Sequence, residues 1–316
     1  MGESGETVRD RVRGALLGLA VGDAVGTTVE FMPPGTFPPV EDMTGGGPFR
    51  LKAGQWTDDT SLALCLAESL IEKRCFDPVD QLNRYVRWWQ DGHMSSTGSC
   101  FDIGGQTRRA LEEHSRTSAP FCGPVGERNA GNGSLMRLAP VPMAYHRSPA
   151  AAMVYGGESS RTTHGNRECV DACRYFSGLL VGAFAGAFRD EILSPHFCPV
   201  SGMWEAEPLS PNVADVAGGS FRRKQQKDVQ GSGYVVSCLE AALWAFSETG
   251  SFKEAILRAV NLGDDADTTA AVCGQIAGAF YGEQAIPSEW LRKLARRELI
   301  EELAEGLLQY GRSAEP

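Results

Sequence analysis

Helical periodicity, with glycines repeated four residues apart inside it, is the feature of this sequence that most constrains its fold. Glycines stand four apart at Gly178, Gly182 and Gly186, and again at Gly274 and Gly278. This spacing lets helix backbones approach closely, which suits helices that cross at steep angles better than a coiled coil. The sequence has no convincing alternating strands and no repeat of about 20–50 residues. We therefore predict an all-α fold, with residues 1–316 forming a single domain.

The apolar pattern predicts a series of helices separated by loops rich in glycine and proline. We expect them over residues 7–21, 58–73, 78–90, 108–114, 149–163, 166–188, 234–247, 252–260, 265–281 and 288–308. Another helix is expected to start at Asn132 and to be interrupted around Pro140 and Pro142. Residues 190–230 hold several prolines and the basic run 222–224, and we interpret them as a surface excursion with little packed core. The basic run is either a solvated face or a contact for an acidic partner.

Charge and cysteine usage narrow the class of protein. The net charge of −10 disfavours nonspecific binding to nucleic acid or to an anionic membrane, so neither partner is expected. Nine scattered cysteines without zinc-binding spacing predict reduced thiols in a cytoplasmic protein. The N-terminal segment is polar, unlike a secretory signal, and the longest apolar run, at 177–188, is too short to span a bilayer. A monomer is the default expectation.

Two clusters of acids and hydroxyls, about two hundred residues apart, each precede an apolar helical pattern. The first holds Thr57, Asp58 and Asp59, and the second runs from Asp264 to Thr269. Such residues are favourable at helix N-termini without any function, because they cap free N–H groups and interact with the helix dipole. However, adjacent carboxylates repel each other unless a cation neutralises them, and these clusters hold more acid than capping needs. Two ordinary caps and the two halves of one metal site are therefore both open interpretations.

The ligand chemistry decides which metal such a site would take. Mg²⁺ and Mn²⁺ prefer about six oxygen ligands, which carboxylates and hydroxyls supply. Zinc would require histidine or cysteine, and neither stands beside these clusters. A pair of hard cations about 3.5–4 Å apart would use this many carboxylates.

Five further segments carry candidate functional residues that also have ordinary structural explanations. Residues 131–134, Gly-Asn-Gly-Ser, resemble a helix start whose N–H groups could approach a diphosphate, although such turns are common. Glu30 could be a loop acid, Asp102 an N-cap, His164 a structural hydrogen-bonding residue and Tyr234 a core aromatic residue. A P-loop nucleoside triphosphatase is disfavoured, because the sequence has no GxxxxGK[ST] motif.

Several motifs in order along the chain carry a resemblance to a known family. They are GALLGLAVGDAVGTTVEF at 14–31, WTDDTSLALCLAESL at 56–70, STGSCFDIGGQT at 96–107, GNGSLMRLAPV at 131–141, TH at 163–164, GYVVSCLEAALWA at 233–245 and GDDADTTAAVCGQIAGAFYG at 263–282. The chain resembles the ADP-ribosylglycohydrolase family. The CFDIG and GYVV segments look closer to its bacterial arginine-specific branch, which includes the dinitrogenase reductase-activating glycohydrolase, than to the branch acting on serine-linked or polymeric ADP-ribose.

The resemblance implies an all-α, orthogonally packed bundle with two Mg²⁺ or Mn²⁺ ions in a central cleft. It assigns the metal ligands to Thr57, Asp58, Asp59, Asp265, Asp267 and Thr268. The segment GDDADT departs from the commoner Gly-Gly-Asp-x-Asp-Thr form at Asp264, which we take as an extra acid at the surface or behind the ligands.

The resemblance also implies roles for the other candidates. Asp102 is expected to perform general acid–base catalysis, and Glu30 to orient the substrate near the metals and the ribose. The expected substrate-binding residues are Asn132, Gly133, Ser134 and Met136 near the diphosphate, His164 near the ribose or phosphate, and Tyr234 near the adenosine.

The implied activity is metal-dependent removal of mono-ADP-ribose from arginine side chains by hydrolysis of the N-glycosidic bond. The implied partners are an ADP-ribosylated protein and ADP-ribose. The alternatives are a hydrolase of another linkage, such as serine-linked or O-acetyl-ADP-ribose, a catalytically silent ADP-ribose-binding relative, and a metal-free helical scaffold whose acids are only caps. The modified target protein cannot be read from the sequence.

Overall fold

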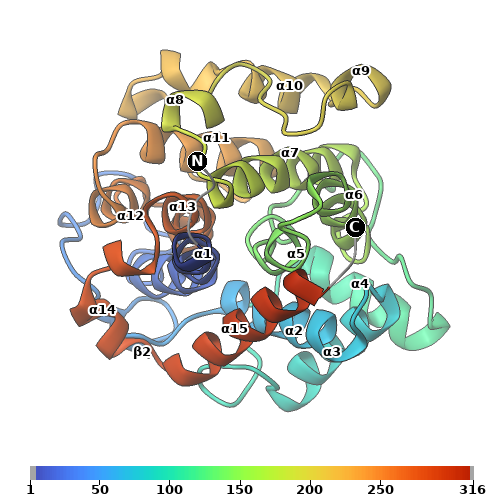
Figure 1. The fold of residues 1–316 in the computed structure, drawn as a ribbon. Helices are drawn as coiled ribbons and strands as arrows, with labels where there is room; N and C mark the ends of the chain where they lie inside the picture. The colour runs from blue at the N-terminus through green and yellow to red at the C-terminus, as the bar shows by residue number, and fades with distance from the viewer. Residues whose placement is uncertain (1–4, 314–316) are drawn as a thin grey trace.

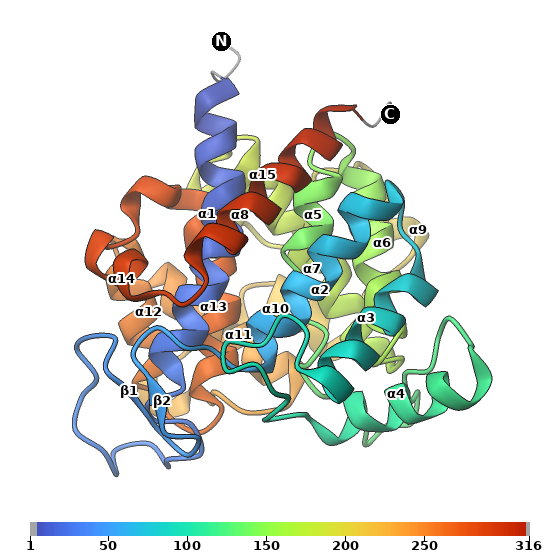
Figure 2. The ribbon, with the colours of Figure 1, turned by 90° about the horizontal axis from the view of Figure 1, so that it is seen from below.

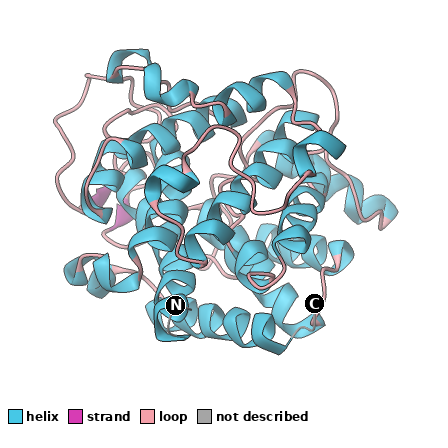
Figure 3. Ribbon diagram, turned by 45° about the horizontal axis from the view of Figure 1, so that its top comes forward, coloured by secondary structure: helices cyan, strands magenta, loops and turns pink. Residues whose placement is uncertain are grey.

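The computed structural model describes residues 5–313, which are mostly helical (Figures 1 and 3). The α-helices are α1 (Gly5–Gly26), α2 (Asp58–Lys73), α3 (Pro78–Asp91), α4 (Gly105–Thr117), α5 (Pro140–Ala144), α6 (Pro149–Arg161), α7 (Arg167–Phe184), α8 (Arg189–Ile192), α9 (Met203–Ala206), α10 (Pro211–Ala217), α11 (Val235–Ser247), α12 (Phe252–Val260), α13 (Ala266–Tyr281), α14 (Ser288–Lys293) and α15 (Arg297–Ser313). Three short 3₁₀ segments are η1 (Ser220–Arg223), η2 (Gln226–Asp228) and η3 (Glu283–Ala285). One two-residue antiparallel pair, β1 (Gly45–Gly46) with β2 (Leu51–Lys52), completes the list. The all-α prediction is confirmed for the described residues.

Helices α1 and α13 make the most extensive helix–helix contact of the fold and run side by side through its centre (Figures 1 and 2). Their backbones touch directly, because the glycines of one face those of the other. A Cβ atom on Gly274 would lie 2.6 Å from the carbonyl carbon of Gly18 and closer still to its oxygen. Gly278 faces Gly14 in the same way. The predicted close approach at Gly274 and Gly278 is therefore confirmed, but the expected steep crossing is wrong for this pair, because the two helices run side by side and antiparallel.

The glycines of α7 serve a different purpose from the one we predicted. A Cβ atom on Gly182 would meet the Phe197 ring at 2.7 Å, and one on Gly178 would meet Pro199 at 3.3 Å. These glycines make room for side chains of the following segment rather than for another helix backbone. Gly186 lies beyond the end of α7, with a positive φ of 84°.

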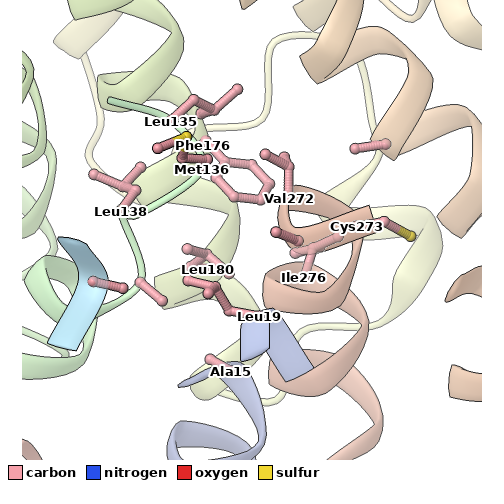
Figure 4. Packing of buried hydrophobic residues seen from close by; sticks show 14 of the residues in the cluster. Ala15, Leu19, Leu135, Met136, Leu138, Phe176, Leu180, Val272, Cys273 and Ile276 are labelled. Atoms are coloured by element: carbon pink, nitrogen blue, oxygen red, sulfur yellow. The ribbon is translucent and has the colours of Figure 1, made fainter. Parts of the chain in front are cut away.

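The core lies where α1, α7 and α13 meet the segment before α5. Figure 4 shows Phe176 and Leu180 of α7 between Val272 and Ile276 of α13 and the turn that carries Leu135. These side chains are fully buried. The core therefore fixes the turn at residues 131–137 against α13, which also begins at one of the two acid clusters.

Two predicted elements differ from the structure. Residues 132–137 form turns rather than a helix, and Pro140 begins α5 instead of interrupting one. Proline suits the first turn of a helix, where its missing N–H has no partner to lose. The turn at 132 is held by distant residues, because the N–H of Asn132 donates to the Gly233 carbonyl at 3.1 Å.

Residues 190–230 contribute more to the core than we predicted. They form the short helices α8 to α10 and lie along the edge of α7 and α11 (Figure 1). Val213, Val216 and Phe221 are buried there. The prediction of little packed core was wrong, because apolar residues scattered between prolines show no periodicity yet still meet α7 and α11.

Within residues 5–313, every helix is too short or too polar to cross a bilayer.

Candidate functional site

The two acid clusters meet at one place, as the metal-site interpretation requires. The Thr57 hydroxyl lies 3.2 Å from Asp267 Oδ2 and 3.3 Å from Asp59 Oδ2. The Thr268 hydroxyl donates to the same Asp59 oxygen at 3.3 Å. Asp58 and Asp265 line the cavity beside them. Residues from the starts of α2 and α13 therefore form a continuous cluster of oxygens.

The N-cap residue of each cluster does not cap its own helix with its side chain. Thr57 is the N-cap of α2 and Asp265 the N-cap of α13, and neither side chain makes a capping hydrogen bond. The interpretation of these two residues as ordinary caps was therefore wrong. Their side chains point instead into the shared cluster.

Asp23 of α1 caps α2 from outside. One of its oxygens accepts from the N–H and hydroxyl of Thr57, at 2.9 and 3.0 Å. The other accepts from the N–H and hydroxyl of Thr60, at 3.0 and 2.6 Å. Asp23 is fully buried, and our sequence analysis did not single it out. A single acid within the apolar segment GALLGLAVGDAVG was the signal that could have identified it.

Burial and mutual repulsion disfavour the ionised forms of these acids. Burial raises the pKa of Asp23 to about 6, although four hydrogen bonds from Thr57 and Thr60 counter it. Burial, followed by the charge of Asp102, raises the pKa of Glu30 to about 9. Burial and nearby acids raise the pKa of Asp102 to about 7. For Asp58, Asp59 and Asp267, burial and then neighbouring acids hold each pKa well above its usual value, and burial also raises the pKa of Asp265. So many carboxyl groups in one buried place favour bound cations or bound protons.

Three buried carboxylate oxygens in this cluster lack a hydrogen-bond partner. They are Asp59 Oδ1, Asp267 Oδ1 and Glu30 Oε2. A buried oxygen without a partner costs about 1–3 kcal/mol, which a cation ligand would offset. Glu30, Asp102 and Asp267 each place one oxygen within 4.8 Å of the others. The donor set, all oxygen, fits Mg²⁺ or Mn²⁺.

A cavity of about 500 Å³ opens above the acids. Ten of the predicted site residues line it: Glu30, Asp58, Asp102, Asn132, Gly133, Met136, His164, Asp265, Asp267 and Thr268. Thr57 and Asp59 do not line it, although their side chains bond to the cluster. The wall also includes residues that we did not predict, among them Phe31, Gln106, Thr107 and Arg109.

The turn at residues 131–136 is fixed to both halves of the site. Asn132 donates its side-chain amide to Asp265 at 2.9 Å. Gln275 of α13 donates to the carbonyl oxygens of Leu135 and Met136, at 3.2 and 2.8 Å. Gln106 of α4 accepts from the N–H of Gly131 at 2.9 Å. This network sets the cavity wall at a fixed distance from the acids.

His164 is held as a neutral donor by a buried relay. Arg137 donates to the Thr163 hydroxyl at 2.6 Å, and this hydroxyl lies 2.8 Å from His164 Nδ1. Because arginine can only donate, the hydroxyl accepts from Arg137 and keeps its own hydrogen available. When it donates that hydrogen to Nδ1, the neutral ring carries its proton on Nε2, on the side of the cavity-lining glycines. Burial, aided by the Arg137 charge, lowers the pKa of His164 to about 3, so the ring is neutral.

Gly133 is required at its position by this histidine. A Cβ atom there would lie 2.8 Å from His164 Cε1 and 3.0 Å from Nε2. Arg137 also donates to the Gly133 carbonyl at 2.9 Å. The same arginine therefore positions both the glycine turn and the histidine.

The family of the chain follows from comparison with known proteins. The model of the family described as ADP-ribosylglycohydrolase matches residues 4–316. The chain belongs to the ADP-ribosylglycohydrolase family. Among its relatives, the ADP-ribosylarginine hydrolase Tri1 of Pseudomonas putida is 44% identical over 96% of this chain and 79% of its own length. The ADP-ribosyl-[dinitrogen reductase] glycohydrolase of Rhodospirillum rubrum is 35% identical over 92% of each chain.

A solved structure agrees with this membership of the ADP-ribosylglycohydrolase family. It is titled "ADP-ribosylglycohydrolase-related protein complex" and is 45% identical to this chain. It matches with a TM-score of 0.85 over 97% of this chain and 99% of its own. The helical architecture described above is therefore shared with a relative of known structure.

Two residues to which the family resemblance assigned a binding role lie away from the main cavity. The Ser134 hydroxyl is buried and bonds to Ser160 at 2.8 Å. Tyr234 donates its hydroxyl to Glu168 at 2.9 Å and lines a second cavity of about 410 Å³. Its backbone pairs with Gly131, which connects it to the site only through the main chain.

Proposed function

We propose that this protein hydrolyses the N-glycosidic bond that joins ADP-ribose to the guanidinium group of a protein arginine. The observation that carries the proposal is the meeting of the two acid clusters beneath one cavity, with buried oxygens left without partners. The relative that is 44% identical bears the name ADP-ribosylarginine hydrolase, and this likeness supports the arginine linkage.

The acids would hold the cofactor. We assign two Mg²⁺ or Mn²⁺ ions to Thr57, Asp58, Asp59, Asp265, Asp267 and Thr268. Bound there, the ions would offset the repulsion among the carboxylates and bind the ribose diol.

Asp102 and Glu30 act on the water and the sugar. As the C–N bond breaks, its electron pair goes to nitrogen, so the cationic guanidinium leaves as a neutral guanidine. Water then bonds to the anomeric carbon and must lose a proton. Asp102, held at the cavity wall with a left-handed φ of 59°, accepts this proton and passes it to the guanidine. Glu30, in the segment that follows α1, orients the ribose.

The cavity wall near Asn132 binds the diphosphate. Gly133 lets the phosphate groups approach the backbone, because it has no side chain. We assign the proton of the neutral His164 ring to Nε2, with the Thr163 hydroxyl as donor to Nδ1, so that Nε2 donates to the substrate. The residues that bind the diphosphate are therefore different from Asp102, which transfers the proton.

The test is a panel of defined substrates carrying arginine-linked, serine-linked and O-acetyl-ADP-ribose. We expect turnover of the arginine linkage with Mg²⁺ or Mn²⁺ and none after chelation. Asp59→Asn should abolish it, whereas Asp264→Asn, the matched change of an acid whose side chain does not line the main cavity, should not. Preference for another linkage, or binding of ADP-ribose without turnover, would refute the proposed activity.

A further inference from the structure

Three phenylalanines from separate segments contact one another in series, and one of them, Phe31, lines the main cavity. The ring centroids of Phe31 and Phe49 lie 6.4 Å apart, and those of Phe49 and Phe101 lie 5.2 Å apart. Phe31 lines the cavity, yet 63% of it remains exposed. An exposed phenylalanine in a cavity wall has a free ring face for a ligand.

The sequence places this aromatic group beside the reacting acids. Phe31 directly follows Glu30, and Phe101 directly precedes Asp102. The two acids converge, with one oxygen of each within 4.8 Å of the other. The aromatic group therefore flanks the acids at which we place bond cleavage.

The backbone holds Phe31 in a conformation that phenylalanine disfavours. Its φ is 62°, in the left-handed region. Its N–H donates to the Asp264 carbonyl at 2.7 Å, and the N–H of Asp264 donates back to Met32 at 2.8 Å. A bulky side chain kept in this region, and exposed rather than packed in the core, is typical of a functional position.

We infer that Phe31 is a specificity-determining residue whose ring stacks on the guanidinium group of the substrate arginine. This inference rests on the proposed function and names the part of the substrate that Phe31 recognises. A guanidinium is planar, cationic and weakly hydrated, so it stacks well on an aromatic face. The neighbouring carboxyl groups add charge complementarity. A serine-linked substrate offers no cation and no plane for this contact.

The contact predicts a particular kinetic pattern. The ring contacts the guanidinium most strongly before cleavage, because the positive charge of this group falls as the bond breaks. Loss of the ring therefore weakens substrate binding and raises KM without lowering kcat. It does not touch ADP-ribose itself, so affinity for this product should be unchanged.

The experiment compares Phe31→Tyr, Phe31→Leu and Phe31→Asn with Phe188→Leu, a matched change of an 81% exposed phenylalanine away from the cavity. We measure KM and kcat on ADP-ribosylarginine, Kd for ADP-ribose by calorimetry, and Tm. The leucine and asparagine variants should raise KM about five- to thirtyfold. The tyrosine variant and Phe188→Leu should match the wild type. Phe31→Asn should melt no lower than the wild type, since asparagine tolerates a left-handed φ.

Each other outcome overturns the inference. A parallel loss of ADP-ribose affinity would show that Phe31 contacts the nucleotide or the ribose. Equal KM for Phe31→Leu and the wild type would show that an apolar contact suffices. If the wild type leaves ADP-ribosylarginine intact, the proposed function fails as well. If the wild type is active and the Phe31 variants have the same KM as the wild type, only the stacking contact is overturned.

Discussion

Substituting Gly274 by alanine tests how closely α1 and α13 must approach. In the structure, a Cβ atom on Gly274 would lie 2.6 Å from the Gly18 carbonyl carbon. Carbon atoms in contact prefer about 3.5–4.0 Å, so the two backbones must separate by about 1 Å. No side-chain rotation relieves this clash, because the facing atoms belong to the main chain.

The expected change in the free energy of unfolding has two opposing contributions. Overpacking of a rigid site costs about 1–3 kcal/mol, and we expect the upper end here. The better helix propensity of alanine returns about 0.5–1 kcal/mol. The net loss of about 2 kcal/mol should lower Tm by about 3 °C in a protein of this size.

The assay is thermal and urea unfolding of metal-free protein, with Gly178→Ala as the matched control. Gly178 is also a buried helical glycine, but its Cβ would sit 3.3 Å from Pro199 and 3.5 Å from the flexible Met153. Its substitution should change Tm by less than about 2 °C, because the propensity gain offsets the mild crowding. An unchanged Tm for Gly274→Ala, or an equal fall in the control, would refute the reasoning.

Three further outcomes are expected. Thr163→Val removes the hydroxyl between Arg137 and His164, so ADP-ribose should bind about tenfold more weakly and the free energy of unfolding should fall by about 1–3 kcal/mol. Thr163→Ser keeps the hydroxyl and should retain both the affinity and the stability. ¹⁵N spectra showing the same His164 tautomer in Thr163→Val would contradict the relay. In metal-free protein, the pKa of Asp23 is raised to about 6 and that of Glu30 to about 9. Their contribution to stability is therefore complete below about pH 4 and is lost as pH rises through those values. Urea unfolding should show this decline in stability, and a flat profile identical to that of Asp23→Asn would contradict it for Asp23. Mn²⁺ should raise Tm more at pH 8 than at pH 5, because protons compete with the cation for the same carboxylates, and equal shifts at both pH values would argue against binding at the acid cluster.

The parts of the fold that could be predicted are those fixed by local pattern. Helix α2 was predicted over 58–73 and is Asp58–Lys73, because its apolar residues recur along a single uninterrupted helix. The prediction failed at the turn before α5. There the chain is held by the backbone of Gly233 and by Gln275, partners far away in the sequence.

The site was partly predictable because part of its signal is also a local pattern. The excess of carboxylates at two helix starts indicated that Asp59 and Asp267 belong together. The capping of α2 was not predictable from that segment alone, because Asp23 supplies it from another helix. The family likeness marked Ser134 by its motif, but packing turned its hydroxyl toward Ser160.

The glycine contact between α1 and α13 has a consequence for how the protein is made. Gly18 leaves the ribosome long before its partner Gly274, and at about 5–20 residues per second the delay is on the order of tens of seconds. Throughout that time α1 lacks the α13 backbone that faces its glycines, and Thr57 lacks its contact with Asp267. The two acid clusters therefore come together only when the last third of the sequence has packed against the first helix.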